Sequence, residues 1–271
     1  MKSIFLMMNF IACLLLLSGA CSTGPQLDLA QVAHYEETSR IPNSDSLLVG
    51  IEDKIYQTFV RCIIDQDATA LQSLSERLES TYAERPQNLV RYWSAYLQYY
   101  WAIYHLKSED EKAANRHLQR GIDWLDELPR KNAEDYALLA MMQGFAIRFS
   151  TAKTIQLSRA AKKNVGYALA IDSTNLRAHY VMASNDYYTP AIYGGGKIVE
   201  RHLQRAVALP DQKVENAFLP SWGKELAYEL LVRWYIKGER WAEAKATFQQ
   251  AQGLFPDSYP LNQLAGQLIG R

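Results

Sequence analysis

The feature that most constrains the fold is a pair of helical segments joined by a glycine-rich turn between residues 175 and 210. The first segment is expected from Leu176 to about Tyr188, and the second from Lys197 to about Leu209. Apolar residues of the second segment recur on one stripe, with charged residues elsewhere. Two antiparallel helices of this length cannot bury their apolar faces against each other alone, so they need similar neighbours. The sequence therefore predicts an all-α fold, built as an array of antiparallel helical hairpins.

The composition agrees with a helical fold, and the balance of charges gives the chain no overall attraction to charged partners. Ala, Leu, Gln, Glu, Lys and Arg are frequent, and runs of strictly alternating β-branched residues are missing. Among the 271 residues, 29 Lys and Arg balance 29 Asp and Glu, so the formal net charge is zero. A neutral chain has no overall attraction to nucleic acid or to an acidic membrane surface.

The N-terminal residues predict export and a lipid anchor. Lys2 precedes an apolar run from Ile4 to Leu17, which is too short to span a bilayer comfortably. Residues 17–21 resemble the bacterial lipobox, which implies that Cys21 is acylated and becomes the mature N-terminus; Ser18 departs from the usual aliphatic residue. The alternative is cleavage by ordinary signal peptidase, with Cys21 a bystander.

The same resemblance gives the expected domains and compartment. We expect a lipoprotein signal peptide at 1–20, a tether at 21–45 and a helical repeat domain at 46–271. Ser22 after the cysteine resembles the outer-membrane sorting signal, so the protein is expected in the cell envelope, facing the periplasm. Membrane contact is expected through the N-terminal lipid only. Cys62 would be the one further thiol of the mature chain and lies in an apolar helical stretch, so we expect a buried, inert cysteine.

Helical periodicity and turn signals divide the rest of the chain into successive hairpins. They are expected at 46–86, 88–125, 133–173, 176–209 and 224–256, followed by a final helix that closes the stack. The connector at 211–223 holds Phe218, Pro220 and Trp222. It is too apolar for a free linker, so we expect it to pack back on the array.

The last hairpin resembles the tetratricopeptide repeat (TPR) family in the spacing of its large, small and aromatic residues. The positions that carry the resemblance are Tyr228, Leu231, Val232, Tyr235, Ala244, Phe248, Ala251 and Pro256. Val232 departs from the family, which has a small residue there. Earlier hairpins have longer turns, but the pentapeptide Arg-His-Leu-Gln-Arg at 116–120 recurs at 201–205, which supports internal repetition. The resemblance implies a TPR-like α-solenoid.

A second resemblance covers about residues 133 to 256. The segments 185–190, 193–197 and 220–224 are similar to those of uncharacterised TPR lipoproteins and secreted proteins of the Bacteroidetes. More loosely, the chain is similar to the TPR-type periplasmic lipoprotein associated with TRAP transporters. The first group implies a fold and a compartment without a known activity, whereas the second implies a small ligand.

No stretch carries a recognisable catalytic or metal-binding motif. Pro190 and the triplet Gly194, Gly195 and Gly196 open a helix, but the P-loop pattern lacks its first glycine and its hydroxyl residue. We interpret these residues as a structural turn, in which glycine supplies positive φ angles. The five histidines show no metal-ligand spacing. We therefore expect no catalytic residues, no metal and no cofactor, and a protein that is not an enzyme.

The candidate binding residues lie on the aromatic helix that begins near Asn88. Tyr92, Tyr96 and Tyr99 share one face of it and are either core or, with Asn185 and Tyr188, the lining of an inner groove. We predict a non-catalytic TPR scaffold that binds a protein or peptide partner through its concave face. The alternative is a small-ligand-binding accessory lipoprotein of an uptake system. An open groove favours the scaffold and an enclosed aromatic channel favours the ligand carrier.

Overall fold

The computed structural model describes residues 47–210 and 218–271, and in these ranges it contains helices and no strand. The predicted all-α hairpin array is therefore confirmed. The expected signal peptide, Cys21, the tether and the first part of the connector lie outside the described residues. No helix in the described ranges is both long and apolar enough to cross a membrane.

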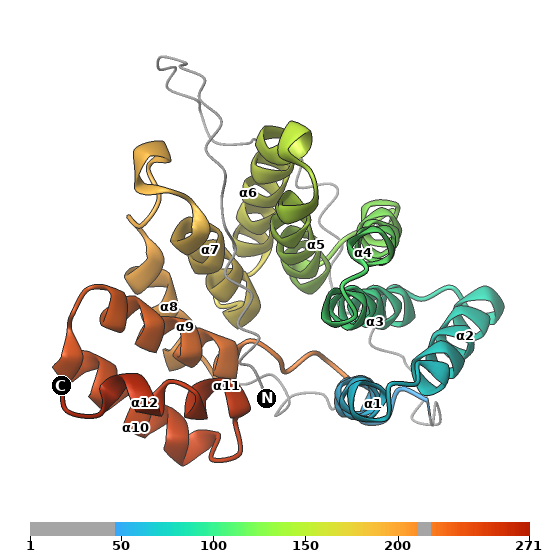
Figure 1. Ribbon diagram of the computed structural model, residues 1–271. Helices are drawn as coiled ribbons and strands as arrows, with labels where there is room; N and C mark the ends of the chain where they lie inside the picture. Colours follow the sequence, from blue (N-terminus) through green and yellow to red (C-terminus); the bar gives the residue numbers. More distant parts are fainter. Residues whose placement is uncertain (1–46, 211–217) are drawn as a thin grey trace, which may run out of the picture.

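The helices follow one another as antiparallel pairs (Figure 1). The α-helices are α1 (Ile51–Asp65), α2 (Thr69–Glu84), α3 (Asn88–Lys107), α4 (Glu111–Asp126), α5 (Ala133–Ala146), α6 (Thr154–Ile171), α7 (Leu176–Tyr188), α8 (Val199–Ala208), α9 (Lys224–Lys237), α10 (Trp241–Leu254), α11 (Tyr259–Asn262) and α12 (Ala265–Leu268). In the described ranges, three 3₁₀ helices lie in turns: η3 (Ile147–Phe149), η4 (Thr151–Lys153) and η5 (Ala191–Tyr193).

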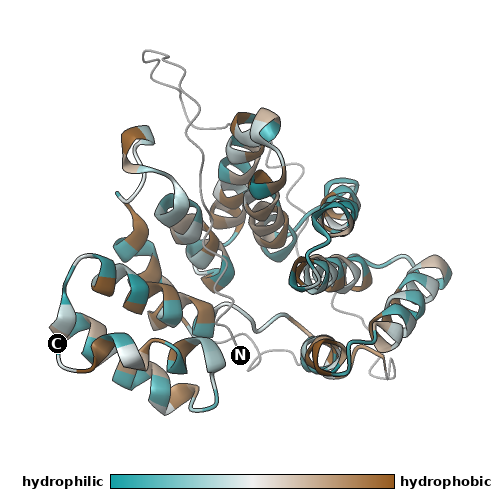
Figure 2. Cartoon of the chain, in the orientation of Figure 1, coloured by the Kyte–Doolittle hydropathy of each residue, from teal (hydrophilic) through white to brown (hydrophobic). Residues whose placement is uncertain are grey.

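The pairs stack into an arch, with α1 and α2 at one end and α9 to α12 at the other (Figure 1). The odd-numbered helices α1, α3, α5, α7 and α9 contact one another in succession, and each contacts its even-numbered partner. Hydrophobic and hydrophilic residues are mixed along the helices (Figure 2), as expected where only part of each helix surface is buried. The odd-numbered helices therefore form a continuous inner layer.

Small residues allow the layers to approach closely. Gly121 of α4 lies so near α3 and α5 that an added Cβ would come within 2.4 Å of the Met142 methyl carbon and 3.1 Å of the Gln98 Cβ. Cys62 is buried in α1, as expected. One apolar cluster runs from α1 through α7 and includes Trp222, so the described end of the connector packs back on the array.

The turn between α7 and α8 depends on its glycines. Gly194 and Gly196 have φ angles of 88° and 83°, in the region that favours glycine. A Cβ on Gly195 would lie 1.9 Å from the carbonyl oxygen of Thr189. The carboxylate of Asp186 accepts a hydrogen bond from the Ile198 amide at 2.7 Å, so the chain itself supplies the anion at the start of α8.

Two parts of the array have local structure that the sequence does not predict. The long turn of the third hairpin contains η3 and η4 between α5 and α6. The expected final helix is divided into α11 and α12. A tight hydrogen bond from the Leu264 amide to the Leu261 carbonyl, 2.8 Å long, replaces the regular helical pattern between them.

Candidate binding face

Aromatic rings cover much of the inner layer of helices. We call the following set the aromatic face: Tyr56 on α1, Tyr96, Tyr99 and Tyr100 on α3, Phe145 on α5, and Tyr180 and Tyr188 on α7. Ring centroids of Tyr96 and Tyr100 are 5.2 Å apart, and those of Tyr99 and Phe145 are 5.5 Å apart. These distances are typical of favourable aromatic pairs. The inner layer is thus bound together by rings as well as by aliphatic packing.

Helical spacing accounts for this grouping. Tyr99 and Tyr100 follow Tyr96 by three and four positions, and Tyr180, Ser184 and Tyr188 follow one another at intervals of four, so each set shares one side of its helix. Tyr56 and Tyr188 are 46% and 40% exposed, whereas Tyr96 is 4% exposed. The aromatic face therefore has a buried floor and an accessible rim.

The end of the connector lies across one part of this face. Figure 1 shows it running from the start of α9 towards α1. The indole N–H of Trp222 donates to the Tyr92 hydroxyl at 2.7 Å. Its ring stacks on Tyr96 at 6.1 Å and meets Tyr180 edge-on at 6.4 Å. Trp222 is thus an aromatic anchor held by rings of α3 and α7.

Polar contacts hold the connector backbone beside this anchor. The Trp93 indole N–H donates to the Phe218 carbonyl at 3.2 Å, and Arg177 Nη1 donates to the Trp222 carbonyl at 3.1 Å. The amide and hydroxyl of Ser221 donate to the carboxylate of Glu52, at 2.6 and 3.0 Å. Side chains of α1, α3 and α7 therefore form hydrogen bonds with this non-helical segment on the inner face.

A buried ion pair positions Arg177. Its Nε lies 2.5 Å from Glu134 Oε2, and Asn175 donates to the other oxygen of the same carboxylate at 2.6 Å. Burial disfavours the charge of Arg177, but Glu134 outweighs it and the net effect raises the arginine pKa. The pair joins the first turns of α5 and α7 and fixes the guanidinium that holds the connector.

Around the accessible part of the aromatic face, burial shifts the pKa values of titratable groups in the direction that favours their neutral forms. Burial raises the pKa of Tyr99 to about 12, with contributions from Tyr188 and Glu229. Burial also raises the pKa of Tyr188 and that of Glu229. Glu229 pairs with Arg233 of the same helix at 2.8 Å. At neutral pH the tyrosines keep their protons, so they can offer rings and hydroxyl hydrogen bonds to a bound group.

The predicted groove residues are distributed unequally. Tyr92 is buried beneath Trp222, and Tyr96 lies at the floor of the aromatic face. Tyr99 and Tyr188 lie in its accessible part, close enough to interact electrostatically. Asn185 instead faces Gly144, between α7 and α5. Its buried Nδ2 has no hydrogen-bond partner in the described part of the chain.

Sequence reasoning did not select Tyr180, Phe145 or Trp222 as site residues. The Tyr180–Ser184–Tyr188 spacing was a usable signal, because residues four apart share a helix side. Trp222 gave no such signal, since its contacts join segments that are far apart in the chain. Among the described residues, no group of three or more His, Cys, Asp or Glu side chains is arranged to hold a metal ion.

Comparison with known proteins gives one structural likeness. No family model and no curated protein matches this sequence. The structure is similar to that of the HusA haemophore from Porphyromonas gingivalis, with a TM-score of 0.48 and 20% sequence identity. The match covers 69% of this chain and 94% of the haemophore chain.

Proposed function

We propose that the protein is a non-catalytic TPR scaffold, lipid-anchored through Cys21 in the bacterial envelope, that binds an extended segment of a protein partner on its aromatic face. One observation carries the proposal: the inner layer already holds a non-helical segment of its own chain, the connector residues 218–223. A tryptophan anchor, carbonyls paired with Arg177 and Trp93, and a carboxylate paired with Ser221 hold that segment. These are the contacts by which binding proteins recognise extended peptides.

The part of the aromatic face beyond the connector offers the same physical properties. Tyr99, Tyr100 and Phe145 are half-buried, and Tyr188 is exposed beside them. Their rings lose little conformational entropy on binding, and their neutral hydroxyls can pair with a backbone. A partner segment with an aromatic side chain would continue the ring contacts that Trp222 begins.

A second candidate is a small-ligand carrier, an accessory lipoprotein of an uptake system. The observation that favours it is the position of Trp222, which covers one end of the aromatic face and shortens the surface open to a long peptide. The Glu229–Arg233 pair lies beside the tyrosines that remain and could orient a polar group of a compact, mostly apolar ligand.

One purification experiment tests both candidates. The full-length lipoprotein is purified from its native membrane with everything that co-elutes, and proteins and small molecules are identified by mass spectrometry. The double variant Tyr99→Ala/Tyr188→Ala removes the accessible rings, and Tyr259→Ala removes a 68% exposed tyrosine of α11 as a matched control. Loss of a protein in the double variant alone supports the scaffold, and loss of a small molecule supports the carrier. Retention of all of them in both variants refutes both.

A further inference from the structure

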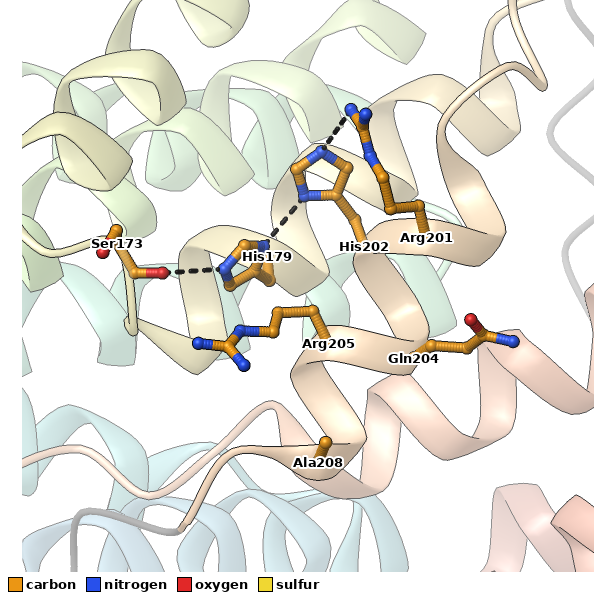
Figure 3. Close-up of a pocket in the computed structure, with 7 residues that line it drawn as sticks. All are labelled: Ser173, His179, Arg201, His202, Gln204, Arg205 and Ala208. Carbon is orange, nitrogen blue, oxygen red and sulfur yellow. Dashed lines mark hydrogen bonds between the residues drawn. The ribbon is translucent and has the colours of Figure 1, made fainter.

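A second hollow lies between α7 and α8, built from residues that the aromatic face does not use. It is an open depression of about 500 Å³, lined by Ser173, His179, Arg201, His202, Gln204, Arg205 and Ala208 (Figure 3). The lining contains basic and neutral side chains and no carboxylate. The depression therefore carries a local excess of positive charge, although the formal net charge of the chain is zero.

A chain of hydrogen bonds fixes the protonation of its two histidines (Figure 3). His179 Nε2 lies 3.0 Å from the Ser173 carbonyl, which can only accept, so this nitrogen carries the proton. Burial lowers the pKa of His179 and lowers that of His202 to about 4, so both rings are neutral at pH 7. His179 Nδ1 is then an acceptor, and His202 Nδ1 must donate to it across 2.9 Å.

The same chain orients one arginine. Because His202 Nδ1 donates, its Nε2 is an acceptor, and it faces Arg201 Nη2 at 3.4 Å. The histidine pair therefore directs the Arg201 guanidinium at the rim of the depression without neutralising its charge. The charge of Asp172 raises the pKa of His179, and the charge of Asp186 raises that of His202. Both carboxylates lie outside the lining of the depression.

Arg201 and Arg205 stand one turn apart on α8, an arrangement in which like charges repel. In the described part of the chain, neither guanidinium has a carboxylate partner. Arg205 lies alongside His179 and the Ser173 carbonyl (Figure 3). Both arginines line the same depression, with their guanidinium groups on either side of the histidine pair (Figure 3).

The repeated pentapeptide provides an internal comparison. In the α4 copy, Arg120 pairs with Glu79 at 2.8 Å and lies over the Trp124 ring at 4.5 Å. His117 bonds to Gln98 at 2.7 Å instead of to a second histidine. The depression at that copy, of about 510 Å³, is lined by the acidic side chains of Asp123 and Glu127. The α4 copy thus pairs Arg120 with a carboxylate and has two acidic side chains in its depression, whereas the described residues give the α8 copy neither.

We propose that the depression between α7 and α8 binds an oxyanion of the phosphate type. Arg201 and Arg205 bind the anion, and the His179–His202 pair orients the Arg201 side chain. Guanidinium groups present paired donors that match phosphate oxygens, and a phosphate carries close to two negative charges at neutral pH. The open depression leaves room for a larger molecule that carries the phosphate group. That molecule is either a soluble phosphate ester or a lipid headgroup.

The primary test measures binding of inorganic phosphate to the full chain by isothermal titration calorimetry. The double variant Arg201→Ala/Arg205→Ala is expected to weaken phosphate binding at least tenfold. The matched control Arg116→Ala/Arg120→Ala removes the same residues from the α4 copy and should leave the affinity within twofold. Circular dichroism checks that each variant is folded. Equal affinities in the two double variants, or no phosphate binding by the parent chain, overturn the proposal.

A second arm distinguishes the sources of the phosphate. The chain with Cys21→Ser, which lacks the acyl acceptor, is sedimented with vesicles of phosphatidylglycerol and phosphatidylcholine and with vesicles of phosphatidylcholine alone. If only the anionic vesicles bind, and Arg201→Ala/Arg205→Ala abolishes that binding, the source is a lipid headgroup. If vesicles do not bind while inorganic phosphate does, the source is a soluble phosphate ester.

Discussion

Replacing Trp222 by alanine tests whether the connector is held on the inner face. The side chain is only 7% exposed, and its ring contacts Tyr96 and Tyr180. A fully buried tryptophan removes up to about 250 Å² from water, which at roughly 25 cal/mol per Å² sets an upper limit of about 6 kcal/mol. Trp→Ala substitutions in cores cost about 3–5 kcal/mol. We expect the free energy of unfolding of Trp222→Ala to fall by about 4 kcal/mol.

The assay is urea-induced unfolding of the full chain, followed by far-UV circular dichroism. Trp222→Phe keeps a ring but removes the indole N–H, leaving the buried Tyr92 hydroxyl without its donor. The free energy of unfolding of that variant should fall by about 2 kcal/mol, because an unpaired buried polar group costs about 1–3 kcal/mol. Trp241→Ala, on the partly exposed surface of α10, is the matched control and should lose less than either. A loss below about 1 kcal/mol for Trp222→Ala would refute the reasoning that the connector is anchored in the inner layer.

Three further predictions concern stability. Glu134→Gln leaves the buried Arg177 charge uncompensated and should lower the free energy of unfolding by about 3–5 kcal/mol, measured in urea; an unchanged midpoint contradicts this. His117 and His202 have pKa values lowered to about 4, so unfolding is favoured as the pH falls from about 6.5 to about 4 and not above it. After allowance for solvent screening, we expect each histidine to account for about 1 kcal/mol of the stability lost over this pH range. Substitution of either histidine by asparagine should remove its share of the pH dependence, and an unchanged pH profile contradicts this. Gly195→Ala should cost on the order of 2 kcal/mol, because its Cβ collides with the Thr189 carbonyl; a thermal midpoint equal to that of the parent chain contradicts it.

The helical array could be predicted because its signals are local. The expected segment from Leu176 to about Tyr188 matches α7, since apolar periodicity and the following turn residues bound it on both sides. The next helix begins at Val199 and not at Lys197, because Asp186, on the other side of the turn, accepts the Ile198 amide. When a contact across a turn sets where a helix begins, the sequence of that helix alone does not show the boundary.

The candidate site could be predicted only in part, for the same physical reason. The density of tyrosines on α3 identified this helix as a candidate binding surface, but it did not show that Tyr92 is covered and Tyr99 is accessible. The difference depends on Trp222, which covers Tyr92 from a distant part of the chain. The two copies of the pentapeptide are identical in sequence, yet Glu79 of α2 satisfies Arg120 in one copy only. Which side chains are available for binding is therefore decided by tertiary packing.

Site-specific photo-crosslinking tests the central claim most directly, namely that a partner binds the open part of the aromatic face. A photoreactive phenylalanine analogue replaces Tyr188 in one full-length chain and Tyr259 of α11 in another, and both are irradiated in native cells. We predict that position 188 captures a defined adduct and that position 259 captures none. Equal capture at both positions, or capture at position 259 alone, would contradict the account.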